Sequence, residues 1–310
     1  MKADFLLSGL LAVLSVGAGS EVTAQANDTK PVETCSAWIQ GRPWAEHASD
    51  PRTRILSDHA ACYDGMIERE SDSIEELHGW LNGIDAQGEA TATLVVRSGG
   101  GDAHIGLDLA EELQAKNVRV YLMGICASSC ANFLYAGVRD RHVLDGTLVL
   151  FHGGFSVETR TRSMASLDKL LAGPRGALIK DHDEVRRTAR EAFDATMARQ
   201  DALYHNIGVN PAIVHAVDAM DFTGIIDRNC GGASDLPRDF VYFNLAQMER
   251  LGVAPVSGQP ETNPKRVNER IATLGRSFVA CVVPEQVLQT ENSKAQSRRP
   301  RSSIHIQNSH

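Results

Sequence analysis

Residues 118–136 read VRVYLMGICASSCANFLYA and decide the expected fold. The apolar run Val118–Met123 predicts a buried strand, and the small residues Gly124–Ala131 predict a tight junction between that strand and a helix starting near Ser128. A serine at a helix N-terminus usually only caps the helix. It can act chemically when its hydroxyl lies beside free N–H groups at the positive end of the helix dipole. The junction is therefore a candidate site.

The segments on either side of this junction continue an alternation of strands and helices. An α/β fold with a largely parallel sheet follows, because buried parallel strands need helical crossovers. The long helix that we expect after these strands should lie outside the sheet. The expected strands are 91–96, 141–144 and 147–151, and the expected helices are 105–115 and 181–204.

Two further segments lie where predicted strands end, and each contains residues that could take part in catalysis. Ser98–Asp102 reads SGGGD, and its glycines can expose N–H groups to an anion or an oxyanion. The same residues are also typical of a plain tight turn with no binding role. His152 ends an apolar strand. A lone histidine there is more often structural, but a base at a strand end can reach a nucleophile at a neighbouring strand end.

Together the three segments resemble the proteolytic subunit of the Clp protease, within the Clp/crotonase superfamily. The matching residues are Gly100-Gly101 after a strand, Gly124-Ile125-Cys126-Ala127-Ser128 at a helix start, and Val149-Leu150-Phe151-His152 at a strand end. The similarity spans roughly residues 62–228, and the Cys126–Cys130 spacing looks like that of secreted relatives. It implies a core of repeated β-β-α units with additional helices.

The resemblance also implies the roles of individual residues. Ser128 becomes the nucleophile, His152 the general base and Asp221 the acid, while the N–H groups of Gly101 and Ser129 form the oxyanion hole. The stretch between His152 and Asp221 is longer than in the family. The additional residues fall in the region where the family makes the contacts of its ring, so the resemblance does not imply a ring-shaped assembly here. A homo-oligomer is left open. The implied reaction is acyl transfer on peptide or unfolded-protein substrates, as in a serine peptidase. It needs no metal or organic cofactor, and outside the cytoplasm no ATPase partner is expected.

Two other functions remain open at this point. One is a non-catalytic protein that keeps the fold and binds a peptide or a carboxylate, with a Cys126–Cys130 disulfide deforming the site. The other is a crotonase-like acyl-CoA enzyme, which ranks lower because CoA is a cytoplasmic cofactor. A lysine base has no obvious candidate, since Lys116 and Lys180 are the nearest lysines in sequence.

The N-terminus predicts export to the periplasm or the medium. A basic start at Lys2 precedes the apolar run Phe5–Leu14, and Ala24-Gln25-Ala26 fits a cleavage site, with Val16-Gly17-Ala18 as a second choice. The alternative is an uncleaved membrane anchor, but the run falls short of the ~20 residues that a span needs. Six cysteines in an oxidising compartment indicate disulfides whose pairing the sequence leaves open.

Composition and order of segments complete the expected organisation. The net charge of −8 argues against nucleic acid as the main partner, because a phosphate-binding protein needs a basic face. We expect a signal peptide over 1–26, an irregular N-terminal segment over 27–60, the Clp/crotonase-like domain over 61–230, a C-terminal extension over 231–290 and a disordered basic tail over 291–310.

Overall fold

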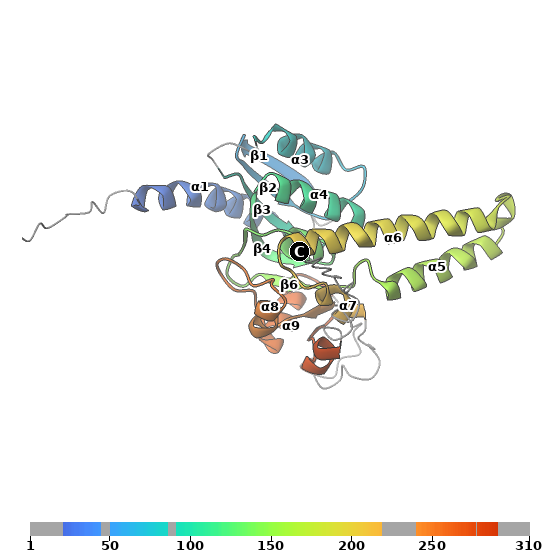
Figure 1. Cartoon of the computed structure of the whole chain (residues 1–310). Helices are drawn as coiled ribbons and strands as arrows, with labels where there is room; N and C mark the ends of the chain where they lie inside the picture. Colours follow the sequence, from blue (N-terminus) through green and yellow to red (C-terminus); the bar gives the residue numbers. More distant parts are fainter. Residues whose placement is uncertain (1–20, 45–49, 86–90, 219–239, 277, 291–310) are drawn as a thin grey trace, which may run out of the picture.

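The structure is a computed structural model that describes residues 21–44, 50–85, 91–218, 240–276 and 278–290. It is an α/β fold, as the sequence predicts, in which one mixed sheet carries helices on both faces (Figure 1). The proposed signal peptide up to residue 20, Asp221, Cys230 and the basic tail lie outside the described residues.

In the described part of the chain, the sheet has six strands in the order β1-β2-β3-β4-β5, with β6 also paired to β4. The β1–β2 pair is antiparallel and every other pair is parallel. The strands are β1 Arg52–Ser57, β2 Ala60–Asp64, β3 Thr93–Ser98, β4 Arg119–Ala127, β5 Arg141–Val143 and β6 Leu148–Leu150.

Strand β4 is longer than the sequence predicts and positions the candidate site. Its first half pairs with β5 and its second half, Ile125–Ala127, pairs with β6. Gly124, with φ +68°, lies between the two halves, where the register of β4 against β3 shifts and a residue without Cβ adopts this backbone conformation readily. Parallel pairing of β4 with β6 places the carboxyl ends of both strands at the same sheet edge.

The two faces of the sheet follow the period-2 alternation of strand residues. Leu94 and Val96 pack with helices α3 (Asp72–Gly83) and α4 (Ala103–Ala115) in the main core. Between them in sequence, Val95 faces the other way and packs against Cys35 and Ile39 of helix α1 (Glu21–Gln40). Strands buried on both faces explain the continuous apolar runs that predicted them.

The N-terminal segment differs from the irregular structure expected over 27–60. It contains most of α1 and all of β1, and a disulfide joins Cys35 of α1 to Cys62 of β2. Helix α1 includes Pro31 and has no clear apolar stripe, so periodicity does not reveal it. Its burial against the sheet is a tertiary effect that local sequence does not carry.

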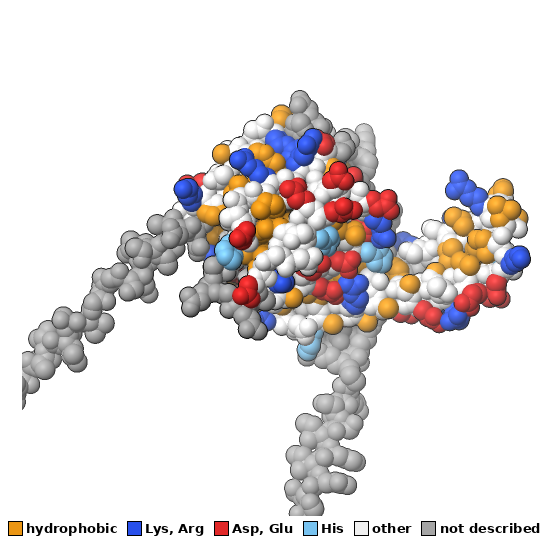
Figure 2. Space-filling view, turned by 90° about the horizontal axis from the view of Figure 1, so that it is seen from above, with side chains coloured by type: hydrophobic (Ala, Val, Ile, Leu, Met, Phe, Trp, Pro, Cys, Tyr) orange, Lys and Arg blue, Asp and Glu red, His pale blue; other side chains and the backbone are white. Residues whose placement is uncertain are grey.

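A helical arm leaves the body of the molecule after β6 (Figure 1). It consists of α5 (Val157–Ala172), the short 3₁₀ helix η2 (Gly176–Leu178) and α6 (His182–Asn206). Ion pairs of Arg160 with Asp194 and of Arg186 with Asp168 join the two long helices. Figure 2 shows apolar side chains near the tip of the arm and charged ones along one edge. The base of α6 is buried at Leu203 and Tyr204, which anchors the arm in the core.

The described C-terminal part shares the core with the sheet. Strands β7 (Phe240–Tyr242) and β8 (Ala280–Val282) form a parallel pair, and a bridge between Phe151 and Val241 joins this pair to the end of β6. Helices α7 (Ala212–Asp218), α8 (Leu245–Arg250) and α9 (Pro264–Thr273) complete this region. Residues from 241 to 288 contribute to the main core cluster, so the segment expected as an extension helps to bury the strand that leads to His152.

Two observations bear on the expected export. Among the described cysteines none is free: Cys35–Cys62 and Cys126–Cys130 are disulfides, and Cys281 is disulfide-bonded as well. Disulfides of this kind persist in oxidising compartments. None of the described helices is long and apolar enough to cross a membrane.

Candidate functional site

Ser128 directly follows β4 and has a backbone conformation that is rare for a side-chain-bearing residue. Its φ is +54°, in the left-handed region. The Ser128 N–H donates to the carbonyl of Leu150 at 2.8 Å, and its own carbonyl accepts from the N–H of Asn132 at 2.9 Å. Residues held in such conformations by their surroundings cluster at functional sites. The strained turn presents the serine between strand and helix.

The helix that follows is a π-helix, η1 (Cys130–Tyr135), rather than the α-helix expected from the sequence. The N–H of Ala136 donates to the carbonyl of Ala131, five residues earlier, which widens the turn. Single π-turns are frequent at functional sites. The wider turn changes which residues face the same side as Ser128.

The glycine turn after β3 packs directly against the serine turn. A Cβ on Gly100 would lie 2.4 Å from the Ala127 carbonyl oxygen, 2.6 Å from Ser128 Cβ and 2.9 Å from the Ser129 nitrogen. Gly100 also has φ +89°, so both space and backbone conformation require glycine. The two turns that the sequence singled out are therefore neighbours in space.

The backbone donors predicted for an oxyanion are available at this junction. Within the described residues, neither the Gly101 N–H nor the Ser129 N–H donates to a backbone acceptor. The neighbouring N–H groups are occupied, because Gly100 donates to Ser98 Oγ at 3.1 Å and Asp102 donates to the Ile67 carbonyl at 2.7 Å. Ser129 is the N-cap residue of η1, at the end of the helix where the first N–H groups have no partner within the helix.

A pocket of about 330 Å³ opens in front of Ser128. It brings together residues from the serine turn, from the end of the β6 strand and from the arm. Ser128 is half-buried and His152 is exposed, and the His152 ring packs on Phe240 with centroids 5.2 Å apart. Within the described residues no hydrogen bond joins Ser128 to His152; catalytic hydrogen bonds are often long before substrate binds. The residues that matter here are Ser128, Ser129, Asn132, His152, Thr159 and Arg162.

The five predicted site residues do not all lie in the pocket. Ser128, Ser129 and His152 line the pocket, while Gly101 lies on the adjoining turn and is not part of the pocket wall. Asp221 lies outside the described residues, so the third member of the expected triad has no position here. No acidic side chain from the described part of the chain lines the pocket.

Asn132 is a pocket residue that the sequence analysis missed. Its Nδ2 donates to the Gly153 carbonyl, and its backbone carbonyl accepts from the Tyr204 hydroxyl at 2.6 Å. Its Oδ1 is buried without a hydrogen-bond partner, as is the hydroxyl oxygen of Ser129. Buried polar atoms are normally paired, so an unpaired acceptor beside a pocket is available to a ligand. A polar residue within the otherwise apolar stretch ANFLYA was the available signal.

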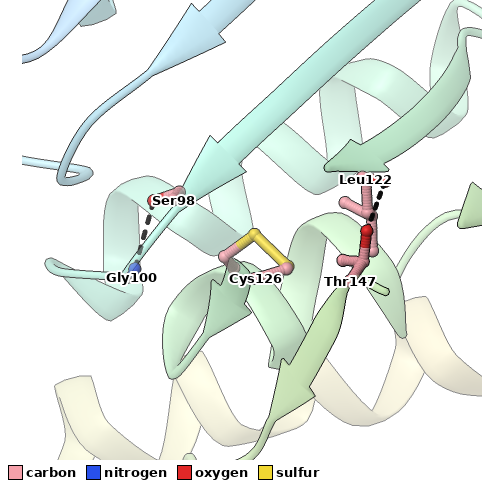
Figure 3. Close-up of a disulfide and its surroundings, with 6 residues drawn as sticks. Ser98, Gly100, Leu122, Cys126 and Thr147 are labelled. Atoms are coloured by element: carbon pink, nitrogen blue, oxygen red, sulfur yellow. Dashed lines mark hydrogen bonds between the residues drawn. A yellow bond between two sulfur atoms is a disulfide. The ribbon is translucent and has the colours of Figure 1, made fainter. Parts of the chain in front are cut away.

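A buried disulfide encloses the serine turn. Cys126 lies in β4 and Cys130 begins η1, so their bond closes a short ring around Ala127, Ser128 and Ser129 (Figure 3). Figure 3 also shows the hydrogen bond between Ser98 and Gly100 beside it. A short covalent ring restricts the conformations of the residues within it. The disulfide constrains the backbone of the turn and involves neither the Ser128 nor the Ser129 side chain.

A second hydrogen-bonded group of serine, histidine and aspartate lies away from this pocket. His142 Nδ1 is 2.6 Å from Ser257 Oγ, and His142 Nε2 is 2.7 Å from Asp140 Oδ1. Backbone hydrogen bonds lie beside it: the Val143 N–H donates to the Ser257 carbonyl, and the Val256 N–H donates to the Arg141 carbonyl in β5. These hydrogen bonds attach the loop that carries Ser257 to β5, and Ser257 provides an internal comparison for Ser128.

No family model matches the chain, and no curated protein matches it.

Proposed function

We propose that this chain is an exported serine hydrolase of the Clp/crotonase type that acts on peptides, with Ser128 as its nucleophile. The observation that carries the proposal is the meeting of Ser128 and His152 in one pocket, at the carboxyl ends of adjacent parallel strands. The left-handed conformation of Ser128 and the open N–H groups of Gly101 and Ser129 support it. The disulfides fit the oxidising compartment that export would supply.

The proposed reaction proceeds through an acyl-enzyme. His152 takes the hydroxyl proton of Ser128 as Oγ bonds to the substrate carbonyl carbon, and the negative oxygen that forms accepts hydrogen bonds from Gly101 and Ser129. The carbon–nitrogen bond then breaks, and His152 returns the proton to the leaving amine. Water attacks the ester by the same route and releases the acid. Asp221 would orient the imidazole from the side opposite Ser128.

A fluorophosphonate probe tests the nucleophile directly. The probe should label the purified protein at one residue, which peptide mapping assigns to Ser128. Ser128→Ala should lose the label and His152→Ala should slow it strongly, whereas Ser257→Ala should label like the wild type. A label on Ser257, or none on the folded protein, would exclude the proposed nucleophile.

A binding protein that keeps the same fold is the second candidate. The unpaired Asn132 Oδ1 and the disulfide-bound turn suit a rigid site that holds a peptide without cleaving it. The two functions separate in the probe experiment: a binding protein would take up peptide but leave Ser128 unlabelled.

A further inference from the structure

The far end of the helical arm exposes large apolar side chains. We call residues 169–180 the tip; they read KLLAGPRGALIK and cover the end of α5, all of η2 and the turn before α6. Among the described residues four large apolar side chains are exposed, and two of them belong to the tip: Leu170 at 48% and Leu178 at 85%. The arm holds these leucines away from the sheet (Figure 1), so they can reach a surface that the body of the molecule does not touch.

Three basic side chains accompany the exposed leucines. Lys169, Arg175 and Lys180 are all exposed, and the tip contains no acidic residue. Figure 2 shows basic side chains beside the apolar ones at the end of the arm. The tip therefore combines apolar surface with positive charge. The acidic side chains next to it make contacts along the arm instead, in the ion pairs Asp168–Arg186, Asp183–Arg186 and Glu184–Arg187 and in the helix cap at Asp181.

The backbone of the tip is largely hydrogen-bonded within itself. Pro174 has no N–H, and a Cβ on Gly176 would overlap the Leu171 backbone, so the turn is tightly closed. Backbone groups that already have partners lose little when water is removed from around them. The turn can therefore enter a less polar environment at reduced cost. Four of its N–H groups donate to carbonyls of the same segment, those of Gly173, Gly176, Leu178 and Ile179.

The charge and size of the tip favour a lipid surface over a second copy of the chain. If two arms met tip to tip, the basic side chains of one copy would face those of the other and repel them. Two exposed leucines also supply only a small part of the roughly 1,200 Å² that a specific protein interface buries. Anionic headgroups attract basic side chains, and the region beneath them accepts apolar ones.

We propose that the tip binds the surface of a bilayer that contains anionic lipids, with Leu170 and Leu178 inserted below the headgroups and the three basic side chains on the phosphates. The contact is peripheral, because twelve residues with a turn among them fall short of the ~20 that a span needs. Helix α5 has 16 residues and is about 24 Å long, and its start lines the pocket. Binding would therefore hold the Ser128 pocket about one helix length from the lipid surface.

Co-sedimentation of the full mature protein with vesicles tests the lipid contact. The vesicles are phosphatidylcholine alone and an equal mixture of phosphatidylcholine and phosphatidylglycerol. Wild type should bind the mixed vesicles at least about tenfold more strongly than the neutral ones, because several basic side chains meet the anionic surface. Added salt should weaken this binding, because it screens exposed charges.

Variants of the tip separate its apolar and charged contributions. Leu170→Ser/Leu178→Ser should weaken binding to the mixed vesicles about tenfold, because the apolar side chains that insert are lost. Lys169→Gln/Arg175→Gln/Lys180→Gln should lower the preference for the mixed vesicles about tenfold. Val256→Ser is the matched control, because Val256 is an exposed apolar residue outside the arm, and it should bind like the wild type.

The outcomes decide between the partners of the tip. All variants share the same termini, so differences in binding report on the tip alone. No binding of wild type to the mixed vesicles, or wild-type binding by both tip variants, would overturn the proposal. A lower molar mass of the leucine variant in analytical ultracentrifugation, with no vesicle binding by wild type, would instead assign the tip to a contact between copies. None of these measurements involves Ser128, so the hydrolase proposal can fail while the lipid contact stands.

Discussion

Ser128 and Ser129 are adjacent and chemically identical, and the structure gives their side chains different surroundings. Ser128 is half-buried at the pocket, whereas the Ser129 hydroxyl is buried and unpaired. Ser128→Ala should abolish hydrolysis, because loss of a nucleophile from a cooperating triad costs on the order of a millionfold in turnover.

Ser129→Ala should retain most activity, because the variant keeps the backbone N–H that is proposed to bind the oxyanion. Its free energy of unfolding should change by less than about 1 kcal/mol, since the hydroxyl that is removed has no partner to lose. Peptide hydrolysis and chemical denaturation of both variants provide the comparison. Activity that is lost in Ser129→Ala and kept in Ser128→Ala would move the nucleophile by one residue.

Among the residues of the candidate site, the sequence predicted those that directly follow strands and missed those whose position depends on tertiary packing. Ser128 and His152 end apolar runs whose parallel arrangement brings strand ends together. Asn132 reaches the pocket from a π-helix, whose wider turn breaks the periodicity used to assign helix faces. Arg162 lines the pocket because α5 starts at Val157, five residues after His152, and so lies beside the site.

The disulfide within the serine turn connects two elements, β4 and η1. Replacing Cys126 and Cys130 together by alanine should lower the free energy of unfolding by about 2 kcal/mol, as expected for a short cross-linked loop. It should also slow fluorophosphonate labelling of Ser128, because the left-handed turn loses a covalent constraint. Labelling at the wild-type rate would show that the backbone hydrogen bonds alone maintain the turn.

The boundaries of helices and strands were predictable where a buried apolar run defines a strand. They were not predictable where contacts with distant segments determine where an element ends. The strand expected over 118–123 extends to Ala127 because β6 pairs with its second half, a contact that local sequence does not encode. Helix α4 begins at Ala103 because Asp102 caps it, accepting the N–H groups of His104 and Ile105. The cap also fixes the end of the glycine turn beside Ser128.

On the scale of the whole molecule, the Cys35–Cys62 disulfide attaches α1 to the sheet. It spans 27 residues of sequence, so its removal by a double alanine substitution should lower the free energy of unfolding by about 3–4 kcal/mol. Ser128 labelling of the folded variant should stay at the wild-type rate, because this bond lies on the sheet face that carries α1. Denaturant titration gives the stability, and a large loss of labelling in the folded variant would contradict the separation of scaffold and site.

The same disulfide relates the fold to the expected export. Cleavage after Ala26 would leave residues 27–40 of α1, including Cys35 and Ile39, in the mature protein. The part of α1 that packs on the sheet would therefore survive processing. N-terminal sequencing of protein from the extracytoplasmic fraction checks this, and an intact Met1 in cytoplasmic protein would contradict it.

A crystal structure of the fluorophosphonate-treated protein would test most directly whether Ser128 is a nucleophile served by His152 and by open N–H groups. Phosphorus should be bonded to Ser128 Oγ, with the phosphonyl oxygen about 3 Å from the nitrogens of Gly101 and Ser129. A His152 ring nitrogen should lie within hydrogen-bond reach of the adduct, with Asp221 at the other ring nitrogen. An adduct on a different serine, or a phosphonyl oxygen turned away from both N–H groups, would contradict the claim.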